Sequence, residues 1–151
     1  MSADLDTPYR GGFVDGEHHF ALTVYYEDTD AGGVVYYATY LRFMERARSD
    51  MLRSVGFDQR KVLQSGGGAY FVSEANIRYV RPAVLGDDLR VLSSVEQIRA
   101  VSVRIQQRVM RGKELLADGR ITVAFLDSRG RPQRQPKEWV EIFQSVTKKP
   151  Q

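Results

Sequence analysis

The sequence predicts an α+β domain in which a curved antiparallel sheet wraps around one long central helix. Three observations predict this fold: a strand-like segment, a long amphipathic segment soon after it, and four more strand-like segments joined by short turns. The chain has 151 residues, of which 42% are hydrophobic, and this fits one domain with a substantial core. We expect residues 1–19 to form a flexible N-terminal arm and residues 20–151 to form the single domain.

The first strand is expected over residues 19–27. Their sequence, "HFALTVYYE", is rich in β-branched and aromatic residues. His18 and His19 stand at or before the beginning of this strand, so we expect both side chains at the surface.

A helix is expected over residues 36–55. Its apolar side chains recur at steps of three and four residues, namely Tyr37, Tyr40, Met44, Ala47, Met51 and Val55. Gly56 is a suitable C-terminal stop. Arg48 falls within the apolar stripe, so its side chain is expected either to reach solvent along its aliphatic stem or to meet a carboxylate.

Four antiparallel strands should follow this helix. They are expected over residues 70–81, 89–99, 101–111 and 113–127, with a tight hairpin at Gly112-Lys113 and a bulge at Gly119. A flexible loop is expected at 64–69 and a terminal helix over 137–146, opened by Pro136. The edges of such a sheet are bare in a monomer, so we expect a homo-oligomer, either a dimer or a tetramer of dimers.

Composition excludes several classes of protein. The net charge is only +3 and the basic residues form no long block, which argues against nucleic acid as a partner. The absence of cysteine excludes disulfides, thiol catalysis and Cys-ligated zinc, and we expect no metal. No uncharged stretch approaches the roughly 20 residues of a membrane span, and the N-terminus lacks the apolar segment of a signal peptide. We therefore expect a cytoplasmic protein.

The segment before the predicted helix has the chemistry of a catalytic turn. Asp30 is followed by Gly32 and Gly33, which let backbone approach a ligand closely, and then by a helix start with free N–H groups. A carboxylate beside such donors suits hydrolysis of an activated carbonyl. Asp28 and Asp30 could equally cap the helix or close an Asx turn, and spacing alone leaves both interpretations open.

Two segments resemble a known family. "YYEDTDAGGVVYYATYLRFMERAR" at residues 25–48 and "IRYVRPAVLGDDL" at 77–89 resemble the hotdog-fold acyl-CoA thioesterases. Within this family the segments look most like the YbgC type, encoded with the Tol–Pal system, and next like the 4-hydroxybenzoyl-CoA thioesterases. The resemblance covers roughly residues 20–132. It implies hydrolysis of an acyl thioester of coenzyme A or acyl carrier protein to free acid and thiol. No separate cofactor is expected, since coenzyme A is part of the substrate.

The resemblance also implies roles for individual residues. Asp30 matches the catalytic carboxylate, which acts as base or nucleophile, and Tyr37 matches the position whose backbone N–H polarises the carbonyl. YbgC-type proteins commonly have His where Tyr37 stands, so a mechanism that needs imidazole is not expected. The remaining candidates for substrate binding are Gly32, Gly33, Val34 and Tyr36 near the turn and Arg129, Arg131 and Arg134 near the C-terminus. These three arginines could grip the phosphates of coenzyme A or form an ordinary solvated surface.

The sequence leaves other functions and another acid open. Glu45, in the middle of the helix, is expected to be solvated or paired with Arg48 rather than catalytic. A dehydratase or hydratase acting on β-hydroxyacyl thioesters would pair a histidine with an acid, and no histidine is expected on the helix or the sheet. A non-catalytic partner that binds acyl carrier protein is the third possibility.

Overall fold

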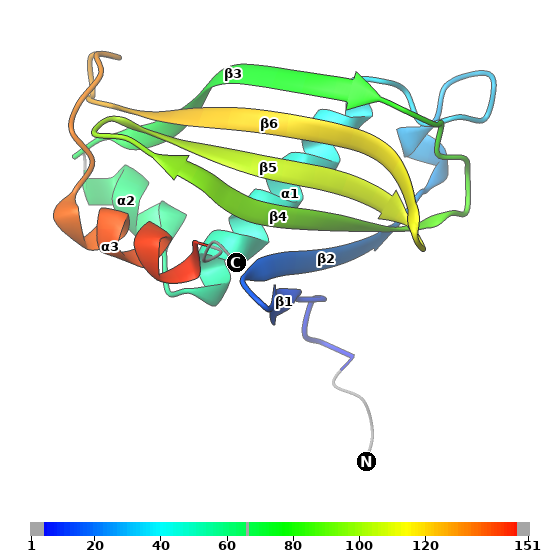
Figure 1. Ribbon diagram of the computed structural model, residues 1–151, viewed down its shortest axis with the longest axis horizontal. Helices are drawn as coiled ribbons and strands as arrows, with labels where there is room; N and C mark the ends of the chain where they lie inside the picture. The colour runs from blue at the N-terminus through cyan, green and yellow to red at the C-terminus, as the bar shows by residue number, and fades with distance from the viewer. Residues whose placement is uncertain (1–4, 66, 148–151) are drawn as a thin grey trace.

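The computed structural model describes residues 5–65 and 67–147 (Figure 1). Its strands are β1 (Gly12–Val14), β2 (Glu17–Thr23), β3 (Ala69–Tyr79), β4 (Asp88–Ile98), β5 (Ser102–Arg111) and β6 (Glu114–Leu126). The helices are α1 (Thr39–Ser54), α2 (Gln59–Ser65) and α3 (Lys137–Val146), and a 3-10 turn covers Tyr26–Asp28. The described helices include none long and apolar enough to cross a membrane.

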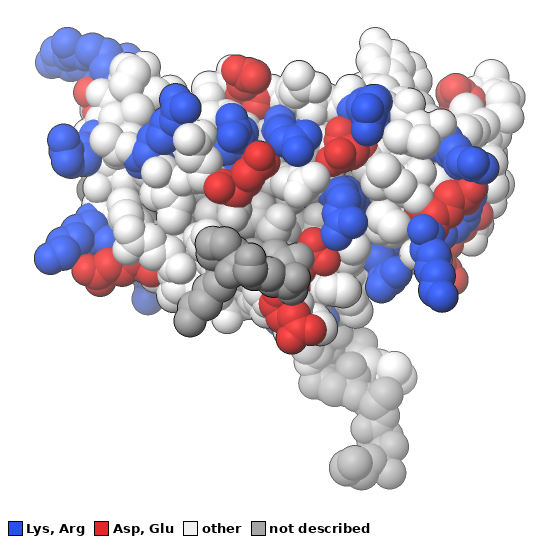
Figure 2. Space-filling model, viewed as in Figure 1, with Lys and Arg blue, Asp and Glu red and all other residues white. Residues whose placement is uncertain are grey.

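The six strands form one antiparallel sheet in the order β1-β2-β4-β5-β6-β3. The sheet curves around α1, which crosses its concave face, while α2 and α3 cover one end (Figure 1). The predicted α+β architecture and the four late antiparallel strands are confirmed, and the β5–β6 hairpin turns at Gly112-Lys113 as expected. On the face seen in Figure 2, basic and acidic side chains are interspersed over the strands, without one continuous basic patch.

The core lies between α1 and the concave face of the sheet. Tyr40, Met44, Ala47 and Met51, all from the predicted apolar stripe, are buried there, together with Phe43. Apart from Met51, which belongs to a second cluster, they pack against mainly aliphatic side chains of the sheet, including Val91, Val109, Leu116 and Ile121. This packing buries one face of the helix, and the spacing of apolar residues at steps of three and four predicted that face.

Gly119 has a different role from the one predicted. It pairs in register with Ile77 of β3 and Gln107 of β5, so the expected bulge there is wrong. A Cβ at this position would lie 2.9 Å from the Met44 Cε atom, so glycine lets α1 pack closely on β6. The sheet irregularity in β3 occurs instead between Val72 and Glu74.

The prediction of a flexible arm is wrong for residues 12–19. Gly12–Val14 and Glu17–Thr23 form a hairpin that extends the sheet, and His18 is completely buried. The His18 Nε2 atom lies 2.9 Å from Asp50 Oδ2, which also accepts a hydrogen bond from the Gly11 N–H. A carboxylate on α1 thus pairs with the Nε2 atom of an imidazole that the sequence alone suggested was at the surface, while its buried Nδ1 atom has no described hydrogen-bond partner.

The end of the molecule next to α2 holds a second core of aromatic residues. Phe57, Tyr70, Trp139 and Phe143 stack there in edge-on and tilted arrangements, and the Phe57 and Trp139 ring centroids are 4.7 Å apart. The α3 helix has the predicted bounds. The α2 helix was not predicted, because its seven residues are too few to show a clear period.

Candidate active site

Asp30 closes a tight turn directly ahead of α1. Its Oδ1 atom accepts a hydrogen bond from the Gly32 N–H at 2.8 Å, and its own N–H donates to the Val34 carbonyl at 2.9 Å. The Gly33 N–H donates back to the Asp30 carbonyl at 3.1 Å. Gly33 has φ +78°, a left-handed conformation that favours glycine. The turn leaves the carboxylate exposed to solvent, and its Oδ2 atom accepts no hydrogen bond from the described residues.

The connection between β3 and β4 holds this turn in place. Val34 and Val84 form a bridge, the Val35 N–H donates to the Ala83 carbonyl at 2.8 Å, and the Leu85 N–H donates to the Gly33 carbonyl at 3.2 Å. These contacts are made by backbone atoms, so the shape of the turn depends on residues about fifty positions later in the chain.

The start of α1 offers free hydrogen-bond donors beside Asp30. The helix begins at Thr39, so Tyr37 lies in the turn just before it rather than inside it. Within the described residues, the N–H groups of Tyr37 and Ala38 donate to no acceptor of the chain, and Ala38 has no side chain that could cap the helix. Such N–H groups carry the positive end of the helix dipole, and they suit a developing negative charge.

A pocket of about 410 Å³ joins these features. Its lining residues are Glu27, Thr29, Asp30, Tyr36, Ala38, Thr39 and Arg42. Tyr37, which is 63% exposed, borders a second pocket of about 280 Å³ together with Tyr40, Tyr79 and Arg81, among others. Asp30 and Tyr36 therefore line one pocket, Gly32, Gly33 and Val34 belong to the turn beside it, and Tyr37 borders the second pocket.

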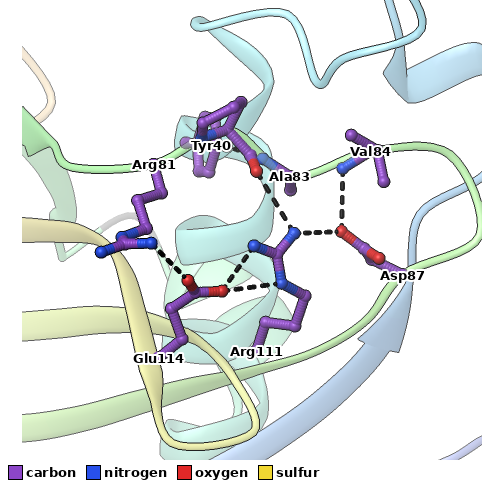
Figure 3. A network of polar contacts seen from close by, with 8 residues as sticks. Tyr40, Arg81, Ala83, Val84, Asp87, Arg111 and Glu114 are labelled. Atoms are coloured by element: carbon purple, nitrogen blue, oxygen red, sulfur yellow. Dashed lines mark hydrogen bonds and ion pairs between the residues drawn. The ribbon is translucent and has the colours of Figure 1, made fainter.

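A polar network that the sequence did not reveal supports the β3–β4 connection (Figure 3). Arg111, at the end of β5, donates to Asp87 Oδ2 at 2.7 Å, to the Pro82 carbonyl at 3.3 Å and to Glu114. The Asp87 Oδ2 atom also accepts a hydrogen bond from the Val84 N–H at 2.9 Å. Desolvation alone would raise the pKa of Asp87, but the Val84 N–H and the Arg111 guanidinium lower it overall. Arg111 therefore fixes the segment that holds the Asp30 turn.

The three C-terminal arginines lie away from the Asp30 turn in the folded chain. Arg129 and Arg131 belong to the turn after β6, where their N–H groups donate to Asp127 Oδ1 at 2.9 and 3.0 Å. This turn is at the end of the sheet where β3 begins, since Leu126 pairs with Ala69, whereas the Asp30 turn contacts the segment that follows the end of β3. Arg134, three residues further on, is exposed. Within one chain the structure does not bring these arginines to Asp30.

The helix residues Glu45 and Arg48 do not pair with each other. Glu45 is exposed and accepts a hydrogen bond from the Ser49 hydroxyl at 2.8 Å. The Arg48 Nη1 atom donates to Gln107 Oε1 at 2.9 Å, and no described carboxylate lies within ion-pairing distance of it. Glu45 was expected to be either solvated or paired with Arg48, and its side chain is solvated. Arg48 binds an amide oxygen instead of the expected carboxylate.

Comparison with known proteins identifies the family. Residues 24–146 match the model of the thioesterase-like superfamily. The chain is 40% identical over 131 residues to an acyl-CoA thioesterase YbgC of Haemophilus influenzae, an alignment that covers 86% of this chain and 96% of the relative.

Solved structures show the same fold. A probable thioesterase from Bartonella henselae superposes with a TM-score of 0.75 at 32% identity, covering 80% of this chain and 99% of that one. A 1,4-dihydroxy-2-naphthoyl-CoA thioesterase from Synechocystis superposes with a TM-score of 0.79 at 23% identity, covering 84% of this chain and 95% of that one. The fold is the hotdog fold, and the chain belongs to the thioesterase-like superfamily as a thioester hydrolase.

Proposed function

We propose that the protein hydrolyses acyl-CoA thioesters at the Asp30 turn, releasing a free acid and coenzyme A. The observation that carries this proposal is an exposed carboxylate, that of Asp30, in the turn directly ahead of a helix start where the Tyr37 N–H donates to no described acceptor. The printed function of the YbgC relative, an acyl-CoA thioesterase, supports coenzyme A as the thiol carrier.

In the proposed mechanism, the thioester carbonyl oxygen accepts a hydrogen bond from the Tyr37 N–H. As the carbon becomes tetrahedral, negative charge grows on this oxygen at the positive end of α1. One donor of this kind contributes about 3 kcal/mol of transition-state stabilisation. This hydrogen bond needs no imidazole. Because the donor is a backbone N–H, a tyrosine at this position provides it as well as a histidine does.

Asp30 completes the reaction in one of two ways. As a base, its carboxylate takes a proton from a water molecule whose oxygen attacks the carbonyl carbon; the C–S bond then breaks and the thiolate is protonated. As a nucleophile, the carboxylate oxygen attacks directly, the thiolate leaves, and water hydrolyses the resulting anhydride. In either role the Gly32 N–H holds Oδ1 and leaves Oδ2 for the chemistry.

The competing lyase function would require a histidine acting with an acid; contrary to the prediction that the sheet carries no histidine, both histidines lie on β2, and His18 is paired with Asp50. A hydratase or dehydratase needs its histidine and acid in contact with substrate. His18 is completely buried and Asp50 is only 9% exposed, so this pair holds β2 against α1 and no substrate reaches it. The structure therefore favours hydrolysis over addition or elimination of water.

We further propose that two copies complete the site. One edge of β3 pairs with β6, and its other edge pairs with no described strand, although Phe71 and Val72 are both 51% exposed along it. A two-fold axis perpendicular to the sheet would pair two β3 strands antiparallel and keep both helices on the same face. The start of one β3 would then lie beside the end of the other, so the turn with Arg129 and Arg131 would approach the partner's active site.

A thiol-release assay with a panel of acyl-CoA and acyl carrier protein thioesters tests the proposed function. The expected result is release of free thiol from acyl-CoA, with no hydration of an enoyl-CoA measured in parallel at its ultraviolet absorbance. Hydration without thiol release would establish the lyase, and binding of acyl carrier protein without either reaction would establish the non-catalytic partner.

A further inference from the structure

The β3–β4 connection, which holds the Asp30 turn, is buried at one residue and exposed at the next two. Ala83 is fully buried, and its N–H donates to the Tyr40 hydroxyl at 3.1 Å. Val84 and Leu85, which both contact the turn, are 41% and 51% exposed. Packing within one chain therefore does not fix this exposed part of the connection, and polar contacts have to do so.

A carboxylate connects the exposed part to the sheet. Asp87 Oδ2 accepts a hydrogen bond from the Val84 N–H at 2.9 Å and another from Arg111 Nη1 at 2.7 Å. Val84 in turn bridges to Val34, whose carbonyl oxygen accepts a hydrogen bond from the Asp30 N–H at 2.9 Å. A continuous series of contacts thus leads from the Arg111 guanidinium to the Asp30 turn.

Arg111 also binds the beginning of the connection. Its Nη1 atom donates to the Pro82 carbonyl oxygen at 3.3 Å, and its Nε atom donates to Glu114 Oε1 at 3.0 Å (Figure 3). The Nη2 atom donates to the same carboxylate oxygen. The guanidinium therefore ties both Pro82 and Asp87 to the β5–β6 hairpin. This arrangement uses the planar fork of arginine donors, which the single ammonium nitrogen of a lysine does not reproduce.

We propose that Arg111 is a positioning residue for thioester hydrolysis, because it sets where the Asp30 carboxylate lies relative to the start of α1. The inference rests on the proposed function, in which Asp30 performs the chemistry. Arg111 does not line the pocket that holds Asp30, so it acts through Asp87 and Val84. Since a misplacement of about 1 Å can lower a rate about a hundredfold, the loss of this series of contacts acts mainly on kcat.

Arg108 provides a matched control. It lies on the same strand, β5, and its side chain is 34% exposed, compared with 32% for Arg111. It also forms an ion pair, at 2.8 Å, but its partner is Glu17 on β2 rather than a residue of the β3–β4 connection. The two alanine variants therefore remove ion pairs of similar exposure, and only Arg111→Ala removes contacts with the connection.

Kinetics with chemical rescue form the first test. On an acyl-CoA, Arg111→Ala should lower kcat at least about tenfold and leave KM within about twofold, while Arg108→Ala should keep both values. Because Arg111 is partly exposed, guanidinium ion can enter the space that its side chain vacates. At concentrations well below those that unfold proteins, guanidinium should restore part of the lost kcat, whereas urea and sodium chloride at equal concentration should not.

Hydrogen exchange, followed by NMR, tests the positioning without relying on activity. The Val35 N–H donates to the Ala83 carbonyl and the Leu85 N–H donates to the Gly33 carbonyl, so both report the contact between turn and connection. In Arg111→Ala these two amides should exchange at least about tenfold faster, while the amides inside β5 should keep their rates. If the unmodified protein releases no thiol, the proposed function is wrong, and the exchange rates still decide whether Arg111 holds the turn.

Asp87→Asn tests the route of the effect and serves if Arg111→Ala fails to fold. Asparagine can still accept the Val84 N–H but lacks the charge that pairs with Arg111, so kcat should fall and the Val35 and Leu85 amides should exchange faster. The double variant should be no slower than Arg111→Ala, because both changes break the same series of contacts.

Four outcomes would overturn the proposal. Unchanged kcat and unchanged exchange in Arg111→Ala, or in Asp87→Asn, would show that the turn holds itself. An equal loss of kcat in Arg108→Ala would assign the effect to the stability of the sheet. A raised KM with unchanged kcat would place Arg111 in substrate binding. Losses that multiply in the double variant would show that Arg111 and Asp87 act independently.

Discussion

The Tyr79 hydroxyl donates a 2.7 Å hydrogen bond to the Tyr37 carbonyl oxygen. The last residue of β3 thereby fixes the peptide that leads into α1, next to the N–H groups proposed to receive the substrate carbonyl. The Tyr37 and Tyr79 rings also meet edge-on, with centroids 6.4 Å apart. The helix start that we propose to be catalytic is thus positioned from the sheet as well as by its own turn.

Removing this hydrogen bond should slow catalysis without unfolding the protein. Tyr79→Phe keeps the ring contact but loses the hydroxyl, so we expect kcat to fall about fivefold, the equivalent of roughly 1 kcal/mol. Tyr26→Phe is the control, because Tyr26 is 84% exposed and should tolerate the change. An unchanged kcat in Tyr79→Phe would show that the helix start is held by its turn alone.

Tyr37→Phe should have almost no effect on kcat. The proposed donor at this position is the backbone N–H, which phenylalanine retains, and the side chain is mostly exposed. Steady-state kinetics on an acyl-CoA will decide this. A loss as large as that of an Asp30 variant would mean that the phenol hydroxyl takes part in the chemistry.

The buried imidazole predicts how stability depends on pH. Burial lowers the pKa of His18, and the hydrogen bond and charge of Asp50 oppose this effect only in part. The folded protein disfavours protonated His18. The contribution of the neutral imidazole to the unfolding free energy should therefore be fully present above about pH 6.5, and the unfolding free energy should fall as the pH drops below that value. Urea unfolding between about pH 7.5 and pH 5 measures this change.

His19 supplies the matched control for that experiment. It is adjacent on β2 but only partly buried, and of the influences on the pKa of His18 its charge is the smallest. His18→Gln should flatten the dependence of the unfolding free energy on pH, while His19→Gln should leave it in place. The same slope in both variants would assign the dependence to other groups.

The sequence predicted the parts of the structure that depend on local periodicity. The amphipathic pattern of α1, the alternation in β5 and the Gly112-Lys113 turn each depend on neighbouring residues, and each was found. The burial of His18 was missed because its partner, Asp50, is 32 positions away. Arg111 was missed for the same reason: its role rests on Asp87 and Pro82, which come near it only in the folded sheet.

The phosphate-binding role of the C-terminal arginines remains a prediction that depends on assembly. In one chain Arg129, Arg131 and Arg134 lie far from Asp30, but pairing along β3 would bring the turn that follows β6 to the partner's site. We expect at least one of the three Ala variants to raise KM for acyl-CoA with little change in kcat, and the KM of the unmodified protein to rise with salt.

Two results would count against this arrangement. If sedimentation shows an active monomer, the two-copy site is wrong. If all three variants keep the KM of the unmodified protein, the phosphates bind elsewhere. Arg81 would then be the next residue to change, since it borders the pocket lined by Tyr37 and, among the described residues, its guanidinium pairs only with Glu114, in an exposed contact.

The central claim is that Asp30 performs the chemistry, and the rate of thiol release by Asp30→Asn tests it most directly. Asparagine keeps the size of the side chain and can still accept the Gly32 N–H, so the turn should persist. The matched control is Glu27→Gln, which removes another carboxylate from the same pocket. We predict that Asp30→Asn lowers kcat at least about a hundredfold, in the range of a lost acid–base group, while Glu27→Gln stays near the unmodified rate. A folded Asp30→Asn variant with full activity would contradict the account and direct attention to Glu45.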